Sequence, residues 1–333
     1  MKAGKLKESI LKRSILKQLH HRREEIITRP CIGGDYGAFT VKEDEIVVLS
    51  TDPITLAEED IGTFAIYTAC NDVACSGATP IGVLVSILLP TSSNEQQLKD
   101  LIKQLENACE VCYIDILGGH TEVTRAVKMP IITVTAVGTV KKEEQLHSSN
   151  VKVGMDIIAT KWVGLEGTAI LAKEHETELR TRYARPFIDK AKVFSQMMSI
   201  LPEAAIARKS GACAMHDVSE GGIFGALWEL AESSNVGLEI DLKKIPIKQE
   251  TVEICEFFDI NPYKIVSGGC LLIATNDGNA MVRELQKEGI HAVVIGKATD
   301  NNDRVLINED ERRFLETTQT DEMYHTNIDK VNF

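Results

Sequence analysis

The stretch AIYTACNDVACSGATP, residues 65–80, decides how the first part of the chain folds. Nearly all of its residues are small or apolar, which predicts a packed helix over residues 57–76. Gly77 and Pro80 end that helix, because neither residue continues a helix favourably. The apolar run at 83–89 follows directly and predicts a buried strand.

Asp72 is the least expected residue of this helix, because a carboxylate among apolar residues is costly unless it is paired or bound to a metal ion. Two further acids stand near strand ends or glycines: Asp52, which follows the predicted strand at 46–51, and Asp35, which follows two glycines. Any one of them alone is explained as a helix cap or an ion-pair partner. Together they favour an oxygen-ligand site for Mg²⁺.

Strands and helices alternate on both sides of this stretch, as in layered α/β folds. In the first half a helix is expected at 95–112 and strands at 113–117 and 130–140. The polar segment 141–150 shows no periodicity, so we place a boundary there, between domains at 1–140 and 151–333. In the second half, strands are expected at 156–162, 238–242, 270–275 and 292–296, and helices from 167, at 188–200 and at 220–233.

Composition excludes several classes of protein. The 333 residues include 37 Lys and Arg against 49 Asp and Glu, and this excess of acid disfavours nucleic-acid binding. Only residues 2–23 are basic, in a pattern that predicts an amphipathic helix. No export signal and no apolar run of about 18 residues is present, so we expect no membrane span and a cytoplasmic protein with free thiols at its eight cysteines.

Two glycine-containing segments follow predicted strands and are read as loops. The first is Gly118-Gly119-His120-Thr121-Glu122, whose backbone amides could approach an anion, although a tight turn explains the glycines equally well. The second is 164–168 (GLEGT), at the start of a predicted helix, where amides could bind phosphate or the loop could simply cap the helix.

The most distinctive run is His216-Asp217-Val218-Ser219-Glu220-Gly221-Gly222. Glycine at a helix start costs about 1 kcal/mol relative to alanine, so a pair there usually serves close approach of a ligand or of another backbone. The segment Ser267-Gly268-Gly269 has the same character. No Walker A motif and no GxGxxG motif occurs, which disfavours P-loop and dinucleotide-binding folds.

Taken in order, these motifs resemble the superfamily of aminoimidazole ribonucleotide (AIR) synthase, and within it the hydrogenase-maturation protein HypE and its AIR-synthase-related relatives. The resemblance runs over nearly the whole chain. It rests on Gly4-Lys5-Leu6, Gly34-Asp35, Thr51-Asp52-Pro53, the stretch 71–80, the stretch 118–122, the stretch 216–222 and Ser267-Gly268-Gly269.

The resemblance implies an α+β protein with two parts. An N-terminal α/β sheet domain would pair with a second subunit to form a β-barrel homodimer, and a C-terminal α/β domain would complete the chain. It also implies ATP bound in the N-terminal domain through Mg²⁺, and chemistry in which ATP activates an amide-type or other oxygen of a small-molecule or protein-borne substrate.

The resemblance also implies roles for individual residues. The metal ligands would be Asp35, Asp52 and Asp72. The nucleotide would contact Gly4 and Lys5, which belong to a lid. Its other contacts would be Asp52, Asn71, Asp72, Gly118, Gly119, Thr121 and Glu122. The catalytic residues would be His120, His216 and Asp217.

Three departures from the family pattern keep alternatives open. The chain ends at Phe333 without the terminal cysteine of HypE, Tyr36 stands where the family carries a second carboxylate, and His120 replaces an aspartate. An ATP-dependent enzyme with an unknown substrate is therefore weighed against a non-catalytic nucleotide-binding regulator. AIR synthase itself is a third possibility, and the run at 216–222 disfavours it because that enzyme's version is richer in threonine and glycine.

Overall fold

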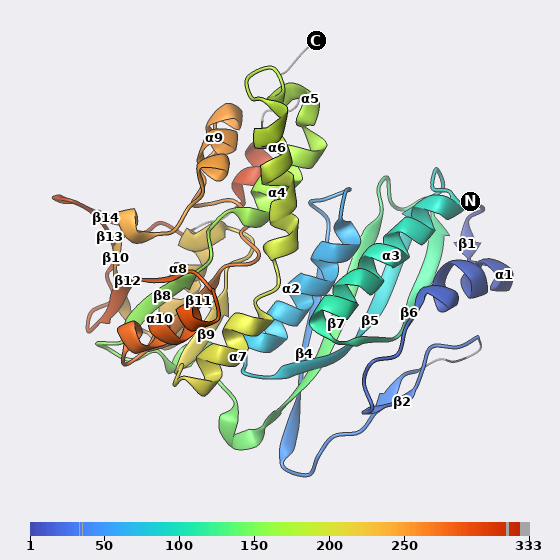
Figure 1. Ribbon diagram of the computed structural model, residues 1–333, viewed down its shortest axis with the longest axis horizontal. Coiled ribbons are helices and arrows are strands. Elements are labelled where there is room, and N and C mark those ends of the chain that lie inside the picture. The colour runs from blue at the N-terminus through green and yellow to red at the C-terminus, as the bar shows by residue number, and fades with distance from the viewer. Residues whose placement is uncertain (33, 35, 318–319, 327–333) are drawn as a thin grey trace. The chain divides into compact units, whose positions relative to one another are not determined.

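The computed structural model describes residues 1–32, 34, 36–317 and 320–326, and the chain divides into two compact units (Figure 1). The first comprises residues 1–74 and 78–145, and the second residues 75–77 and 146–333. No described helix is long and apolar enough to cross a membrane.

The first unit is built on a five-stranded sheet with the strand order β1-β6-β5-β7-β4. Strands β5 and β6 are parallel and the other pairs are antiparallel. Helices α2 and α3 lie across one face of the sheet (Figure 1). The bounds are β1 (Gly4–Lys5), β4 (Glu45–Ile54), α2 (Ile61–Cys75), β5 (Thr79–Pro90), α3 (Glu95–Cys112), β6 (Asp115–Thr124) and β7 (Ile131–Lys141).

Local sequence explains both helices. Asn94 and Gln97 form a capping box at the start of α3, with contacts of 3.0 and 2.9 Å, and Tyr113 ends the helix in the left-handed conformation. Helix α2 is buried on most sides, as its small and apolar residues predict.

The predicted loop at residues 118–122 is wrong, because β6 continues through it to Thr124. Gly119 has φ +149°, and a Cβ atom there would lie 1.9 Å from the carbonyl oxygen of Val85 on β5. Glycine is therefore required by the close approach of the neighbouring strand. The glycine pair at residues 118–119 therefore marks a tightly paired strand and not a loop.

The N-terminal segment is less regular than the predicted amphipathic helix over residues 2–23. It forms α1 (Glu8–Ile10), a π-helical turn (Leu11–Ile15) and a 3₁₀ turn (Leu16–Gln18). Glu95 at the start of α3 holds the segment through Arg13 at 2.5 Å and through the buried Ser14 at 2.8 Å. The segment leads on to the short paired strands β2 (Ile26–Thr28) and β3 (Ala38–Phe39).

The second unit contains a seven-stranded sheet with the order β14-β13-β10-β12-β8-β11-β9. Its core is mostly aliphatic and buried, and it includes Ile157 on β8 and Leu272 on β11. The strands are β8 (Asp156–Thr160), β9 (Ala214–Asp217), β10 (Gly237–Asp241), β11 (Leu271–Thr275), β12 (Ala292–Thr299), β13 (Arg304–Asn308) and β14 (Glu311–Phe314).

Seven helices of this described unit accompany the sheet, namely α4 (Leu165–Glu174), α5 (Glu176–Leu179), α6 (Arg185–Lys192), α7 (Leu201–Lys209), α8 (Gly222–Ser234), α9 (Gln249–Phe258) and α10 (Gly278–Lys287). Strands β8 and β9 each pair antiparallel with the central β11. Three loops therefore lie at the same end of this sheet: those that follow β8 and β9 and the one that precedes β11. The mixed α/β content predicted from the sequence is present in both units.

Candidate functional site

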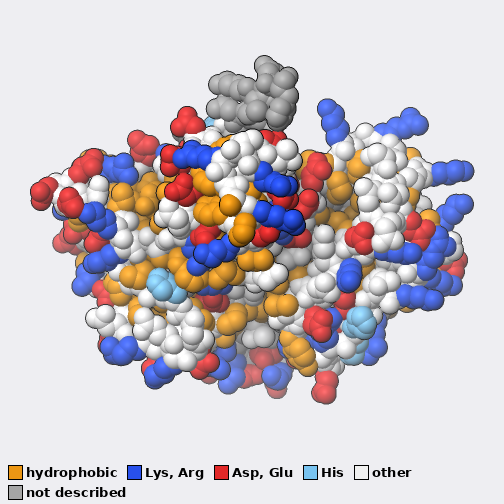
Figure 2. All heavy atoms as spheres, turned by 45° about the horizontal axis from the view of Figure 1, so that its top comes forward, with side chains coloured by type: hydrophobic (Ala, Val, Ile, Leu, Met, Phe, Trp, Pro, Cys, Tyr) orange, Lys and Arg blue, Asp and Glu red, His pale blue; other side chains and the backbone are white. Residues whose placement is uncertain are grey.

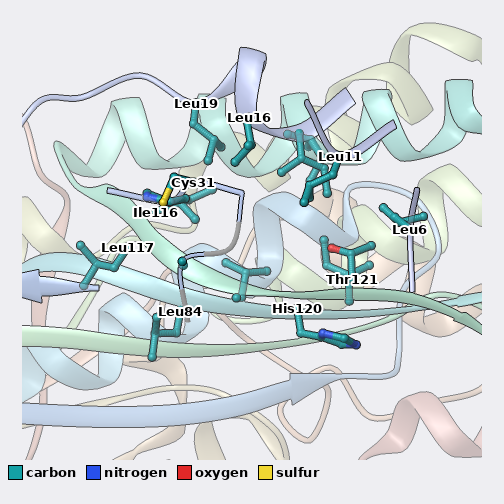
Figure 3. A pocket seen from close by; sticks show the side chains of 18 of the residues that line it. Leu6, Leu11, Leu16, Leu19, Cys31, Leu84, Ile116, Leu117, His120 and Thr121 are labelled. Carbon is teal, nitrogen blue, oxygen red and sulfur yellow. The ribbon is translucent and has the colours of Figure 1, made fainter. Parts of the chain in front are cut away.

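A cavity of about 390 Å³ lies in the first unit, between the N-terminal segment and the sheet. Leu11, Leu16 and Leu19 of the N-terminal segment form one wall, and His120 lies at the opposite side of the cavity in Figure 3. Most of the lining is aliphatic, which suits an apolar or aromatic group of a ligand. Among the predicted nucleotide-binding residues, the cavity is lined by Lys5, Gly118, Gly119 and Thr121.

One edge of β6 faces this cavity without a paired strand. Strand β1 pairs with β6 only at Glu122 and Val123, so no described strand lies beside residues 117–121 on that side. In a strand, every second residue turns both its N–H and its C=O toward the same side. The cavity thus combines apolar walls with a backbone edge that can both donate and accept hydrogen bonds, an arrangement that fits a planar heteroaromatic base.

Basic side chains lie on the N-terminal segment that borders the cavity. Lys5 lines the cavity and makes no ion pair within the described part of the chain. Lys2, Lys7 and Lys17 are exposed on the same segment, and lysine and arginine side chains gather on the right of Figure 2. This surface attracts an anionic ligand even though the whole chain has a net charge of −12. His120 is half-exposed, and its Nε2 lies 3.3 Å from Oε2 of Glu122.

Asp52 and Asp72 come together farther across the sheet, at β4 and α2 and away from the cavity. Ser50 Oγ lies 2.6 Å from Oδ2 of Asp72 on α2 and 3.2 Å from Oδ2 of Asp52 on β4. Asn71 is buried beside Asp72, as the helix pattern predicts. Carboxylate and hydroxyl oxygens of this kind suit Mg²⁺.

The structure does not place all three predicted metal ligands in one site. Asp35 lies outside the described residues, and within them no group of three His, Cys, Asp or Glu side chains could hold a metal ion. Asp52 and Gly119 fall in one row across the sheet, through Val134 and Val85. Three strand spacings separate them, about 14 Å.

His216 on β9 lies between two acids. Its Nδ1 is 3.8 Å from Oδ1 of Asp217, and its Nε2 is 3.2 Å from Oε2 of Glu229. Burial opposes the charged imidazolium, but the contacts with Asp217 and Glu229 outweigh it and raise the pKa of His216 to about 9. The ring is therefore protonated at neutral pH, so it can donate a proton or stabilise negative charge.

The glycine-rich loops of the second unit bond to the chain itself. The N–H of Gly164 donates to Ser267 Oγ at 2.5 Å, that of Gly268 to Glu166 Oε2 at 3.0 Å, and that of Gly221 to Asp321 Oδ2 at 2.7 Å. Of the two readings of residues 164–168, these bonds favour the capping loop, since its first amide is already bonded and Glu166 brings a carboxylate to its side.

Glu166 and Asp321 are the two residues of this network that sequence reasoning missed. Burial raises the pKa of Glu166 to about 7, against the hydrogen bond from Gly268, and nearby Asp321 and Asp217 add to the rise. Burial also raises the pKa of the Asp321 carboxyl. Their partners lie 102 and 100 residues away in sequence, so no local signal could have identified them.

Together, the two α/β units and their motifs define an AIR-synthase-related protein. A model of the "AIR synthase related protein, N-terminal domain" matches residues 33–140, and one of the corresponding C-terminal domain matches residues 152–308. The chain belongs to this family.

Within the family, the chain is similar to hydrogenase-maturation proteins. It is 28% identical to a putative hydrogenase expression/formation protein of Methanocaldococcus jannaschii, over 91% of each chain. It is 26% identical to the carbamoyl dehydratase HypE of Cupriavidus necator, over 76% of this chain and 73% of that one. A crystal structure of the hydrogenase maturation protein HypE in complex with ATP shares the fold, with a TM-score of 0.81, 18% identity and 95% of each chain covered.

Proposed function

We propose that this chain is an ATP- and Mg²⁺-dependent enzyme of the HypE and AIR-synthase-related type, which activates an amide-type or other oxygen by phosphoryl transfer. The observation that carries the proposal is the aliphatic cavity beside the free edge of β6, with Lys5 at its rim. The similarity to HypE, which has been crystallised with ATP, supports it.

In this proposal the base of the nucleotide lies between the leucines of the N-terminal segment and bonds to the backbone edge of β6. Gly118, Gly119 and Thr121 line the cavity at that edge, and Lys5 with its neighbouring lysines attracts the phosphates. Gly4 belongs to the same two-residue strand as Lys5, and in this proposal both form part of a lid over the nucleotide.

Asp52 and Asp72 would hold Mg²⁺, and their donor set fits it because both present carboxylate oxygens next to a hydroxyl. The ion would neutralise the charge of the phosphates. The triphosphate would have to run along the sheet from the cavity toward these acids, and Asn71 and Glu122 stand near the two ends of that path.

His216, His120 and Asp217 remain the proposed catalytic residues. The raised pKa of His216 suits a group that donates a proton or stabilises negative charge on the substrate, and Asp217 keeps the ring protonated. We propose a carboxamide or a similar acyl oxygen as the group acted on, in line with the similarity to carbamoyl dehydratases.

One observation favours a nucleotide-binding regulator as the second candidate. His120 replaces the acid of the family pattern, and its ring lies against Glu122. A regulator would bind MgATP and release no phosphate. Measuring phosphate or diphosphate release with a panel of candidate amides separates the two, because only the enzyme shows turnover that depends on one of the amides.

The binding step is tested by calorimetry with ATP, with and without Mg²⁺. We expect MgATP to bind and the Asp72→Asn variant to bind it at least tenfold more weakly, about 1.4 kcal/mol. The variant should still melt cooperatively, because asparagine keeps the size of the side chain. Asp44→Asn, on the exposed turn before β4, is the matched control and should bind like the wild type. Equal ATP affinity with and without metal would contradict the role of Mg²⁺.

A further inference from the structure

The turn Leu11–Ile15 of the N-terminal segment buries a polar residue and leaves its apolar residues partly exposed. Its single buried residue is Ser14, which is fully enclosed, whereas Leu11 and Ile15 are partly exposed. Apolar side chains normally take the buried positions. Leu11, Ile15 and the following Leu16 line the cavity, and Leu11 and Leu16 extend toward the sheet in Figure 3. The turn therefore presents an apolar surface that a ligand in the cavity would cover.

Glu95, the first residue of α3, holds this turn in place. Its two carboxylate oxygens accept hydrogen bonds from Nε and a terminal nitrogen of Arg13, each at 2.5 Å, and the hydroxyl of Ser14 donates to it at 2.8 Å. A guanidinium fork on both oxygens fixes direction as well as distance. The bonds from Arg13 and Ser14 lower the pKa of Glu95 to about 2, so the carboxylate is ionised at neutral pH.

Further attachments hold the segment before and after this turn. Before it, β1 pairs with β6. After it, backbone N–H groups of residues 20–23 donate to Glu106 and Asp115, at 2.8 to 3.0 Å. Both attachments lie well away from Ser14 along the chain, so the contact with Glu95 fixes the direction in which the turn faces.

We propose that Glu95 is a positioning residue of the nucleotide site. Glu95 does not line the cavity, and it acts by holding the turn Leu11–Ile15 so that the apolar side chains close over the base. The π-helical hydrogen bonding of this turn fits the role, because such turns are rare and frequently occur at functional sites. The inference rests on the proposed function, since it assumes that the cavity receives the base of ATP.

The first experiment measures the binding of adenosine, MgATP and magnesium tripolyphosphate by equilibrium dialysis. Glu95→Gln keeps the size of the side chain but removes the charge that holds the guanidinium of Arg13. We expect this variant to bind adenosine and MgATP at least tenfold more weakly, by the same factor, and to bind tripolyphosphate like the wild type. An effect shared by adenosine and absent for tripolyphosphate lies on the base.

A double-variant comparison shows whether Glu95 acts through Arg13. Arg13→Gln should weaken adenosine binding as much as Glu95→Gln, and the double variant should be no weaker than either, because both changes remove one contact. The side chain of Arg13 is half-exposed, so its variant remains folded and carries the test if Glu95→Gln does not. Glu8→Gln is the matched control, because it breaks the 2.6 Å ion pair with Lys12 on the same segment and should bind adenosine like the wild type.

Hydrogen exchange separates a positioning role from a structural one. Glu95→Gln should speed the exchange of amides at residues 8–19 and leave residues 100–112 of α3 unchanged, because the turn is released while the helix remains. Equal acceleration in both stretches would show that Glu95 stabilises α3, and would overturn the positioning role.

The outcomes distinguish this inference from the proposed function. If the wild type binds adenosine and MgATP and Glu95→Gln binds both equally well, Glu95 positions nothing and the proposed function stands. If Glu95→Gln weakens tripolyphosphate as much as MgATP, or if the wild type binds MgATP but no adenosine, the effect or the cavity does not concern the base and the inference is overturned. If the wild type binds neither, the nucleotide part of the proposed function and the role of Glu95 are both wrong.

Discussion

The two units carry similar motifs, glycines beside acids, and use them in opposite ways. In the first unit the glycines lie on a strand edge that borders a cavity, and Asp52 and Asp72 remain partly exposed. In the second unit the amides of Gly164, Gly221 and Gly268 bond to the chain's own oxygens. Glycine and acid in the sequence therefore do not identify a ligand site, because what matters is whether the backbone groups already have partners.

The largest effect is expected at Gly119, where the paired strand β5 comes so close to β6 that no side chain fits. Gly119→Ala would bring a Cβ atom to 1.9 Å from the carbonyl oxygen of Val85, so β5 and β6 would have to separate. We expect a loss of about 4 kcal/mol in the free energy of unfolding, measured by urea denaturation.

Gly118→Ala is the matched control for this strand. A Cβ atom there meets only Leu84 Cδ2, at 3.4 Å, so the variant should lose less than about 1 kcal/mol. Equal losses in the two variants would show that the glycine pair serves something other than the approach of the strands.

The second-largest effect on stability is expected at Glu166, whose carboxyl group bonds to a glycine-rich loop of the second unit. Its folded-state pKa of about 7 lies above the ordinary 4.5, so the folded chain retains a proton that the unfolded chain releases. Stability therefore falls as pH rises from 4.5 through 7. We expect Glu166→Gln to match the wild type at pH 4.5 and to exceed it by about 3 kcal/mol at pH 8.

Urea unfolding from pH 4.5 to 8.5 measures this difference. Glu288→Gln, which changes an exposed glutamate of the same unit, should leave the pH profile unaltered. A Glu166→Gln variant that is less stable than the wild type at every pH would contradict the neutral, buried carboxyl.

His216 should show the same direction of pH dependence as Glu166, over a higher pH range and with a smaller effect. Its folded-state pKa of about 9 lies above the ordinary 6.5, so its contribution to stability is complete below pH 6.5 and is lost as pH rises through 9. We expect His216→Gln to cost about 2 kcal/mol at pH 6, since Glu229 is largely exposed and its attraction is screened. The cost should vanish near pH 10.

His147→Gln is the control for this prediction, because His147 is exposed in the same unit. Thermal melting of both variants at pH 6, 8 and 10 gives the comparison. A cost that does not change with pH would mean that His216 acts through packing and not through its charge.

The smallest effect on folding, but a clear one on assembly, is expected at the open face of the first sheet. Val47, Leu49 and Leu84 are exposed large hydrophobic residues on β4 and β5. We propose that a second copy of the chain covers them, which gives a homodimer of about 73 kDa, twice the 36.7 kDa of the chain.

Leu49→Lys should yield monomers in light scattering at micromolar concentration, with little change in monomer stability. Val111→Lys, on the exposed side of α3, is the control and should leave the dimer intact. A wild-type chain that is monomeric at this concentration would rule out the dimer.

Sequence reasoning succeeded where the signal was local. The small, apolar pattern around Asp72 predicted the buried helix, and Ser50 links that helix to Asp52. It failed at residues 118–122, because a glycine signal does not distinguish a turn from a close strand approach. It also missed Glu166 and Asp321, whose partners are distant in sequence and whose burial only the folded chain reveals.

Hydrogen exchange with and without MgATP tests the central claim, that the open edge of the first unit is the nucleotide site. We expect slower exchange at residues 115–124 and 4–19 when MgATP is added, and a smaller change in the Asp72→Asn variant. The amides of Val163, Gly164, Gly167 and Thr168, which are already hydrogen-bonded within the second unit, should change little. Protection confined to residues 163–168 and 218–222, with none at 115–124, would rule out a nucleotide site at the open edge of β6.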